Sequence, residues 1–268
     1  MVSIVPLIQR LAPASLNRAR YVRHAVLGKK FVYQHISKAL FQGMGSQQMT
    51  AIDVGANLGI FTRYLSRHFG HTVAIEPLPH LAGLLRRSLP RDVTIERCAL
   101  GNTDGEIIIR TPVSANGEHL DALTTASDKN DLSLFEHAGV HESSVPVRRL
   151  ASLSCSAERI GIIKIDVEGF ENEVLGGSDD IIRRDAPLLQ VEISRAHNPD
   201  YLAFLDAIES MGYSSYTLHE RHLSDDARAV IANQPLKMND PDAANCLFDF
   251  LFVPADKKAL AAPFIRNG

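Results

Sequence analysis

Tryptophan is absent from this 268-residue chain, and cysteine is scarce. The three cysteines, Cys98, Cys155 and Cys246, lie far apart without a Cys-x-x-Cys pair, which argues against a zinc site or disulfide framework and fits a reducing compartment. Long apolar runs are also missing. The N-terminal stretch MVSIVPLI is broken by Pro6, and no later segment reaches the roughly 18 apolar residues of a membrane span. We therefore expect a cytoplasmic protein with neither a secretion signal nor a transmembrane helix.

Acidic residues are absent from the first 49 positions, which contain seven lysines and arginines. The rest of the chain has 21 basic and 31 acidic residues, so a basic arm precedes an acidic body. Such an arm can approach an anionic substrate, a membrane surface or nucleic acid, or it can dock on the acidic body. We expect it to act in substrate closure, in formation of a homo-oligomer or in peripheral contact with an anionic lipid or glycan.

From residue 50 onward, apolar runs alternate with amphipathic segments, as in a parallel sheet covered by helices. Seven strands are expected, at residues 50–54, 71–77, 93–100, 160–167, 187–193, 213–218 and 246–254. Helices are expected at residues 58–70, 79–89, 171–184 and 198–212, the last capped by Asn198 and burying Leu202, Leu205, Ile208 and Met211. No helix is evident between the last two strands, so one of them should be antiparallel. The pattern predicts an α/β fold with a doubly wound, mostly parallel sheet.

The same pattern divides the chain. We predict a basic helical extension over residues 1–49, a main domain over 50–256 and a C-terminal tail over 257–268. Within the domain, residues 106–112 and 143–150 are typical of two antiparallel arms. The polar stretch 113–142 between them is too long for a simple connection, which makes it a candidate lid or substrate loop.

Acidic residues end four of the predicted parallel strands: Asp53, Glu76, Asp166 and Glu192. Ligands of open α/β sheets bind beyond these strand ends. Four crowded carboxylates are costly unless a cation or a set of hydrogen-bond donors lies among them. The alternative interpretation is that some of them only cap the following helices.

The turn after the first strand, Asp53-x-Gly55-x-Asn57-x-Gly59, distinguishes between nucleotide cofactors. It lacks the third glycine of a dinucleotide-binding turn, and its carboxylate would repel a diphosphate. No Gly-Lys-Ser/Thr sequence provides a P-loop. S-adenosylmethionine (SAM), which has an ammonium group, a sulfonium and a ribose but no phosphate, suits this turn better. Glu76 lies 23 residues after Asp53, within reach of both ribose hydroxyls.

Several of these segments resemble the FkbM-type methyltransferases. The likeness lies in DVGANLGIFT, AIEPLP, CALGNTDGE, IIKIDVEGFENEVLGG and PLLQVEI, and covers roughly residues 50–110 and 145–195. It implies the Rossmann-like, seven-stranded class I methyltransferase fold. It also implies SAM-dependent O-methylation of a hydroxyl group on a sugar, glycan or secondary metabolite. Residues 1–49 and 113–142 are not covered by it.

The resemblance also implies roles for individual residues. The methionine end of the cofactor would be lined by Asp53, Gly55, Asn57 and Gly59, with Phe61 and Thr62 beside it. Glu76 would bind the ribose, and the adenine would be flanked by Pro77, Leu78, Ala99 and Leu100. Asp166 and Glu168 would lie beside the methyl group and the acceptor.

A protonated hydroxyl is a poor nucleophile, so a general base or a metal should assist the transfer. We expect Asp166 to orient the substrate or cofactor and Glu168 or Glu192 to accept the proton. His197 is the best-placed histidine for a base, whereas His219 and His222 could project over the pocket as a helical pair. The possibility that Asp166, Glu168 and Glu192 hold a divalent ion is left open, because clustered carboxylates suit hard cations.

Three other functions are less consistent with this sequence. Nucleic-acid methylation is disfavoured, since tryptophan is absent, the body is acidic, and NPDY at residues 198–201 follows the fifth strand as a helix start. An NAD(P)-dependent oxidoreductase would need the third glycine of a dinucleotide-binding turn, which this sequence lacks. A non-catalytic SAM-binding module would keep the cofactor site without transferring a methyl group.

Overall fold

The computed structural model describes residues 34–117, 119–126, 132, 137–219, 222–234 and 248–266. The expectations about the basic residues before position 34 and about Cys246 therefore lie outside the described residues. Among those that are described, Cys98 and Cys155 are free and buried. No helix in this part of the chain is both long and apolar enough to cross a membrane.

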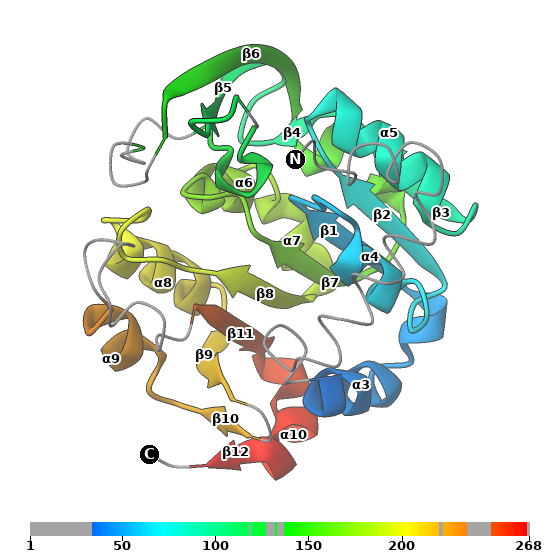
Figure 1. The fold of residues 1–268 in the computed structure, drawn as a ribbon. Helices are drawn as coiled ribbons and strands as arrows, with labels where there is room; N and C mark the ends of the chain where they lie inside the picture. Colours follow the sequence, from blue (N-terminus) through cyan, green and yellow to red (C-terminus); the bar gives the residue numbers. More distant parts are fainter. Residues whose placement is uncertain are drawn as a thin grey trace.

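One large sheet organises the molecule (Figure 1), with the strand order β12-β10-β9-β11-β8-β7-β1-β2-β3. The strands are β1 (Thr50–Val54), β2 (His71–Ile75), β3 (Val93–Glu96), β7 (Ile160–Ile165), β8 (Leu188–Glu192), β9 (Tyr213–Leu218), β10 (Leu223–Ser224), β11 (Asp249–Pro254) and β12 (Ile265–Arg266). The neighbours from β3 to β8 are all parallel, and β11 is antiparallel to both β8 and β9. The predicted seven strands are present, and two-residue strands β10 and β12 extend the sheet to nine.

Helices cover both faces of this sheet, as a doubly wound fold requires. One face carries α3 (Gln34–Gly43), α4 (Ile60–Leu65), α5 (Pro79–Ser88) and α10 (Lys258–Ala261). The other carries α6 (Glu171–Gly176), α7 (Asp179–Asp185), α8 (Tyr201–Ser210) and α9 (Ala227–Ala232). Alternation along β1 shows the division, because Ala51 packs with the first group and Ile52 with the second. Helix α3 belongs to this core although its residues fall within the predicted extension.

A smaller sheet, β4-β6-β5, lies at the top of Figure 1 beside α6. Its strands are β4 (Ala99–Leu100), β5 (Gly105–Val113) and β6 (Gly139–Arg148). The predicted strand 93–100 is therefore two strands in two sheets, β3 and β4. The two antiparallel arms are confirmed and are longer than expected. Short 3-10 helices complete the description: η1 (Ser46–Gln48), η2 (Asp121–Leu123), η4 (Leu150–Ser152), η5 (Ser154–Ala157), η7 (Ala255–Lys257) and η8 (Ala262–Phe264).

The predicted helix 171–184 is wrong in one respect, because it is two helices, α6 and α7. The break follows from a close approach between two backbones. A Cβ atom on Gly177 would lie 1.8 Å from the carbonyl oxygen of Gly101, and the Gly177 carbonyl accepts a hydrogen bond from the Leu150 amide. The chain therefore leaves the helical path where β4 and η4 meet it.

The predicted helix 198–212 begins later than expected. Its N-cap is Asp200, so the predicted cap at Asn198 is wrong. The buried Asn198 side chain instead donates to Glu171 and accepts from Asn172, at 3.3 Å in both cases. Leu202 is 50% exposed, and Phe204 takes its place in the core. The predicted helix 58–70 is likewise shorter, and α9 had not been predicted between the last two main strands.

Candidate cofactor and acceptor site

The turn between β1 and α4 needs glycine for steric reasons. Gly55 has φ +76°, and a Cβ atom there would lie 1.9 Å from the carbonyl oxygen of Asp166. The amides of Gly55 and Ala56 both donate to the carbonyl of Ile75 at 3.1 Å. The ends of β1, β2 and β7 are therefore joined at one edge of the sheet, as the sequence predicted.

Glu76, at the end of β2, is 4% exposed, and its carboxylate is held by backbone amides. Asn57 donates to Oε2 at 2.8 Å, and Leu78 donates to Oε1 at 2.9 Å. Burial raises the pKa of Glu76 to about 7, although the two amide hydrogen bonds act in the opposite direction. A buried carboxylate of this kind is an acceptor suited to the hydroxyl groups of a ribose.

Lys164 is the cation among the strand-end carboxylates, and sequence reasoning gave it no role. Its Nζ lies 2.9 Å from Asp166 Oδ2 and 3.5 Å from Asp53 Oδ1, and 6.0 Å from the centre of the Phe61 ring. Burial alone would lower the pKa of Lys164, but the attraction of Asp166 and Asp53 outweighs it and raises that pKa above its ordinary value. Thr62 completes the cluster by donating to Asp53 Oδ2 at 2.6 Å.

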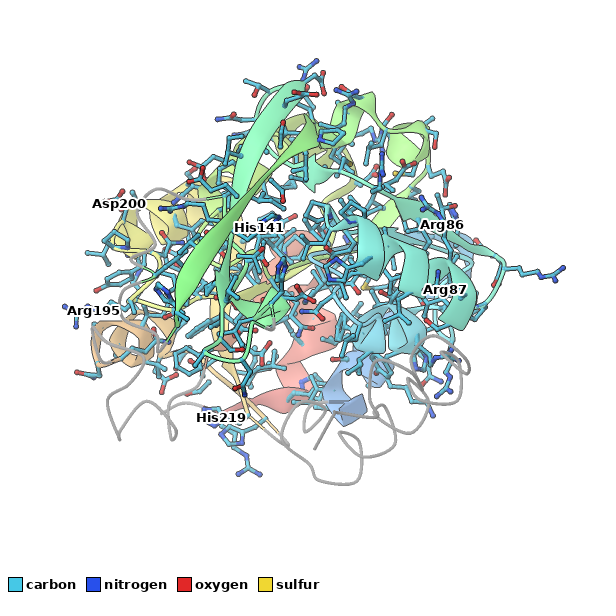
Figure 2. The ribbon with its side chains drawn as sticks, turned by 45° about the horizontal axis from the view of Figure 1, so that its top comes forward. Arg86, Arg87, His141, Arg195, Asp200 and His219 are labelled. Atoms are coloured by element: carbon cyan, nitrogen blue, oxygen red, sulfur yellow. The ribbon has the colours of Figure 1, made fainter. Side chains whose placement is uncertain are left out.

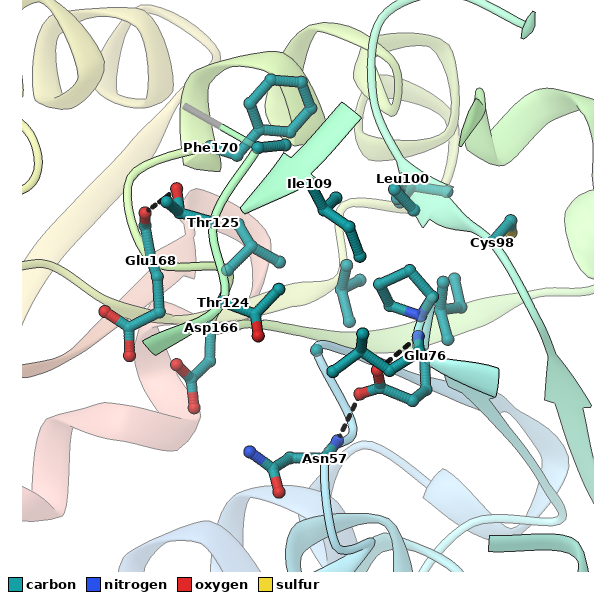
Figure 3. A pocket seen from close by; sticks show the side chains of 18 of the residues that line it. Asn57, Glu76, Cys98, Leu100, Ile109, Thr124, Thr125, Asp166, Glu168 and Phe170 are labelled. Atoms are coloured by element: carbon teal, nitrogen blue, oxygen red, sulfur yellow. Dashed lines mark hydrogen bonds between the residues drawn. The ribbon is translucent and has the colours of Figure 1, made fainter. Parts of the chain in front are cut away.

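A cavity of about 830 Å³ opens above these strand ends (Figure 3). Its apolar part is formed by Val54, Ile75, Pro77, Leu78, Cys98, Ala99, Leu100, Ile109, Ala126, Val167 and Phe170. Its polar part is formed by Gly55, Asn57, Glu76, Asp121, Thr124, Thr125, Asp166, Glu168 and Glu192. A largely apolar hollow with a few convergent polar groups is the usual form of a ligand site.

A second cavity of about 400 Å³ adjoins the first. It is lined by Leu123, Asp166, Glu168, Gly169, Glu171, Glu192, Ser194 and His197. Asp166, Glu168 and Glu192 line both cavities, so we call these three residues the shared acidic wall. His197 Nδ1 lies 2.9 Å from Glu168 Oε2, and the histidine is 4% exposed. The wall thus separates two spaces of different size and carries a histidine–carboxylate pair on the smaller side.

Glu168 is held in an unusual backbone conformation at this wall. Its φ is +54°, a region that side chains other than glycine rarely adopt. The Thr125 hydroxyl donates to the Glu168 carbonyl at 2.6 Å, which ties the wall to the segment between β5 and β6.

Nearby, burial raises the pKa of Glu171 to about 7, although the hydrogen bond from the Gly169 amide acts in the opposite direction. Glu171 and Ser194 also line the smaller cavity, and neither was predicted from the sequence.

The predicted site residues fall into two groups. Gly55, Asn57, Glu76, Pro77, Leu78, Ala99 and Leu100 line the larger cavity, His197 lines the smaller one, and Asp166, Glu168 and Glu192 line both. Asp53, Gly59, Phe61 and Thr62 are not among its lining residues; Asp53 and Thr62 are fully buried beneath it. These two therefore lie where they can support the turn and Lys164.

The expectation that His219 and His222 project over the pocket is wrong. Neither residue lines either cavity. They follow β9 at the turn to β10, where the His219 amide donates to the His222 carbonyl and the two rings stack at 4.4 Å. Figure 2 shows His219 at the rim of the molecule. The pair is also not helical, because the chain turns back between the two strands.

The larger cavity fits the chemistry of SAM. Glu76 offers buried acceptor oxygens for ribose hydroxyls, the apolar part can cover an adenine ring, and the shared acidic wall is complementary to a cation. Within the described part of the chain, no three His, Cys, Asp or Glu side chains are grouped so that they could hold a metal ion. In the carboxylate cluster itself, the cationic position belongs to Lys164.

Comparisons with known proteins agree with this interpretation. Residues 53–215 match the methyltransferase FkbM domain family. Methyltransferase 1 of Beauveria bassiana (strain ARSEF 2860) is 28% identical in an alignment of length 147, which covers 48% of this chain and 58% of that protein. Methyltransferase sdnD of Sordaria araneosa is 26% identical in an alignment of length 160, which covers 48% of this chain and 60% of that protein. The chain thus matches about three fifths of the length of these curated relatives.

A solved structure, methyltransferase FkbM from Methylobacillus flagellatus KT, has a TM-score of 0.46 and 16% identity, covering 77% of this chain and 44% of that one. The family match itself spans more than half of the chain and runs from β1 to β9. It includes β1, β2, β7 and β8, whose ends carry the four strand-end carboxylates. The chain therefore belongs to the methyltransferase FkbM domain family.

Proposed function

We propose that this enzyme transfers the methyl group of SAM to a hydroxyl group of a sugar, glycan or secondary metabolite. The observation that carries the proposal is the His197–Glu168 pair, in which the buried His197 ring lies 2.9 Å from the partly buried carboxylate of Glu168 at the boundary of the two cavities. An alcohol must lose its proton as it attacks, and a histidine supported by a carboxylate is a common general base. The smaller cavity then holds the acceptor, and the larger one holds the cofactor.

Each part of the site has a separate task in this proposal. When bound, SAM supplies an electrophilic methyl group on a sulfonium. The turn at Gly55 and the carboxylate of Glu76 bind and orient the cofactor in the larger cavity. Asp166, fixed by Lys164, and Glu168 line the boundary at which the acceptor oxygen must be aligned. Because alignment and exclusion of water account for much of such a catalytic effect, the rigid position of this wall matters as much as its charge.

The test is a screen of hydroxylated acceptors with SAM, followed by S-adenosylhomocysteine release and by mass spectrometry for the addition of one CH2 group. For an accepted compound, we expect His197→Ala to lower kcat by about 10²- to 10⁴-fold. Glu168→Gln should also lower kcat, because it removes the carboxylate that supports His197. S-adenosylhomocysteine should still bind to His197→Ala, because His197 does not line the larger cavity.

His219→Ala is the matched control, since this histidine lies away from both cavities and should leave kcat unchanged. Methylation of only nitrogen or carbon atoms would contradict the proposal. Equal rates for His197→Ala and His219→Ala would also contradict the proposed base. Failure to release S-adenosylhomocysteine with any acceptor would favour a non-catalytic SAM-binding module. The other alternative, a nicotinamide-dependent oxidoreductase, is already disfavoured by the family match.

Membrane contact or oligomerisation through the basic residues before position 34 stays a separate prediction. It is supported by the charge asymmetry of the chain alone. Vesicles with anionic lipids and a measurement of molecular mass in solution would test the two roles separately.

A further inference from the structure

The segment 119–126 returns along β5 and is fixed there by the backbone. Arg110 and Thr125 exchange two hydrogen bonds, at 2.8 and 3.1 Å. At the other end, the Leu120 amide donates to the Pro112 carbonyl at 2.8 Å, and His119 forms a bridge with Val113. Between these attachments lies η2, whose first residue is Asp121. The family resemblance assigns no role to this segment.

Asp121 has one partnered and one unpartnered carboxylate oxygen. Oδ2 lies 2.7 Å from Nε2 of His80, in the first turn of α5. Oδ1 is buried, and no donor within the described part of the chain reaches it. The residue lines the larger cavity together with Glu76, Leu78 and Thr124. One carboxylate oxygen of Asp121 thus contacts His80, whereas the other, beside the cofactor cavity, lacks a hydrogen-bond donor.

A carboxylate oxygen removed from water without a donor carries a free-energy penalty. Asp121 is also close enough to Glu76 for the two carboxylates to repel each other, and this repulsion adds to the rise in the Glu76 pKa. A ligand that donates hydrogen bonds to both carboxylates removes both costs. The nucleoside half of SAM carries such donors, namely the ribose hydroxyls and the 6-amino group of adenine.

We propose that Asp121 is a cofactor-binding residue, which accepts a hydrogen bond from the adenosine half of SAM while His80 holds its second oxygen. The segment 119–126 thereby takes part in both cavities. Asp121 contacts the nucleoside, Leu123 lines the smaller cavity, and the Thr125 hydroxyl binds the carbonyl of Glu168. The inference rests on SAM binding and not on the identity of the methyl acceptor.

Calorimetric titration with S-adenosylhomocysteine tests the proposal without any acceptor. We expect Asp121→Asn and Asp121→Ala to weaken binding by about ten-fold or more, since both remove the charged acceptor of a hydrogen bond. The adenosine fragment 5′-methylthioadenosine should lose affinity by a similar factor. His80→Gln should have a smaller effect, because it loosens Asp121 without removing the acceptor.

Asp179→Asn is the matched control, because Asp179 is an exposed carboxylate that pairs with Arg183 and lines neither cavity. It should bind as the unmodified protein does, and thermal melting without ligand should show that all variants fold. S-inosylhomocysteine and a 2′-deoxyribose analogue distinguish the two donors. If Asp121→Asn no longer prefers S-adenosylhomocysteine to S-inosylhomocysteine, Asp121 binds the 6-amino group. If the variant no longer prefers S-adenosylhomocysteine to the 2′-deoxyribose analogue, Asp121 binds the ribose. Unchanged affinity of both Asp121 variants for S-adenosylhomocysteine would overturn the proposal.

Discussion

Lys164 determines whether the carboxylates at the sheet edge can coexist. Its ammonium lies between Asp166 and Asp53, and its side chain is only 11% exposed. Removing one member of a buried ion pair leaves the other charge uncompensated. The free-energy cost of that buried charge exceeds the stabilisation that the intact pair provides. Lys164 is therefore a structural requirement for the acidic edge of the sheet.

Replacement of this lysine should destabilise the protein strongly. We expect Lys164→Met to lower the free energy of unfolding by about 3–5 kcal/mol, as for other broken buried pairs. The double variant Lys164→Met, Asp53→Asn should recover part of the loss, because one of the two carboxylates that faced the lysine no longer carries a charge. Denaturant titration of both variants measures this coupling. A double variant no more stable than the single one would count against the pairing.

Glu76 makes cofactor-free stability depend on pH. Its pKa in the folded protein is about 7, above the ordinary 4.5. The folded state therefore binds the proton more tightly, so this contribution to stability is fully present below 4.5 and is lost as pH rises to about 7. Over this interval, Glu76→Gln should lose less stability than the unmodified protein, as measured by thermal melting in matched buffers. Identical pH profiles would contradict the raised pKa.

At the residue scale, sequence reasoning identified the acids but not their cation. Asp53, Glu76, Asp166 and Glu192 were found because strand ends can be located from apolar runs. Lys164 stands two residues before Asp166, so the two share a strand face, and that spacing was an available signal. Its pairing with Asp53 was not available, since it depends on the register between β1 and β7.

Among the elements, the β1–α4 turn shows how backbone approach selects glycine. Gly55 combines a positive φ with a site where a Cβ atom would overlap the Asp166 carbonyl. Gly212 also has a positive φ, +88°, but nothing lies within 4 Å of its Cβ position. Comparison of these two glycines separates conformational strain from steric overlap.

Alanine at the two glycines should therefore have different effects. Gly212→Ala should cost about 1–2 kcal/mol of stability, the cost of a left-handed conformation. Gly55→Ala should cost more and should also weaken S-adenosylhomocysteine binding, because β1 and β7 must move apart at the cavity. Denaturant titration and calorimetry on both variants check this. Equal losses of stability would show that the close approach to Asp166 is unimportant.

Prediction of the elements succeeded where a local pattern decides them. Buried apolar runs gave β1, β7 and β8, and Pro79 marked the start of α5. The break between α6 and α7 could not be predicted, because it depends on contact with Gly101, distant in sequence. Segment 119–126 was recognised only as part of a candidate lid. Its bonds to β5, and hence the position of Asp121, follow from strand pairing that carries no local signal.

On the scale of the whole molecule, two cavities meet at one wall. The larger one is formed mainly by elements up to β5, and the smaller one by residues after β7 and from segment 119–126. Doubly wound topology brings these parts together, so the fold class predicted the location of the site. The second cavity was beyond prediction, because its shape depends on the packing of Leu123, Ser194 and His197.

The shared acidic wall should distinguish the cofactor before transfer from the cofactor after it. We expect SAM to bind more tightly than S-adenosylhomocysteine, since only SAM carries the sulfonium charge near Asp166, Glu168 and Glu192. Glu192→Gln should reduce this preference several-fold, while the surface variant Asp179→Asn should not. Competition titrations with both compounds measure the ratio. A ratio unaffected by Glu192→Gln would rule out this carboxylate as its source.

That wall has a consequence for turnover. In the proposed reaction, transfer of the methyl group to a neutral hydroxyl, with its proton passed to the chain and then to solvent, would abolish the positive charge in the larger cavity. The electrostatic attraction for the reactant cofactor would then be lost when the product has to dissociate. Asp166, Glu168 and Glu192 would thus limit product inhibition and allow the next cycle to begin without any movement of the sheet.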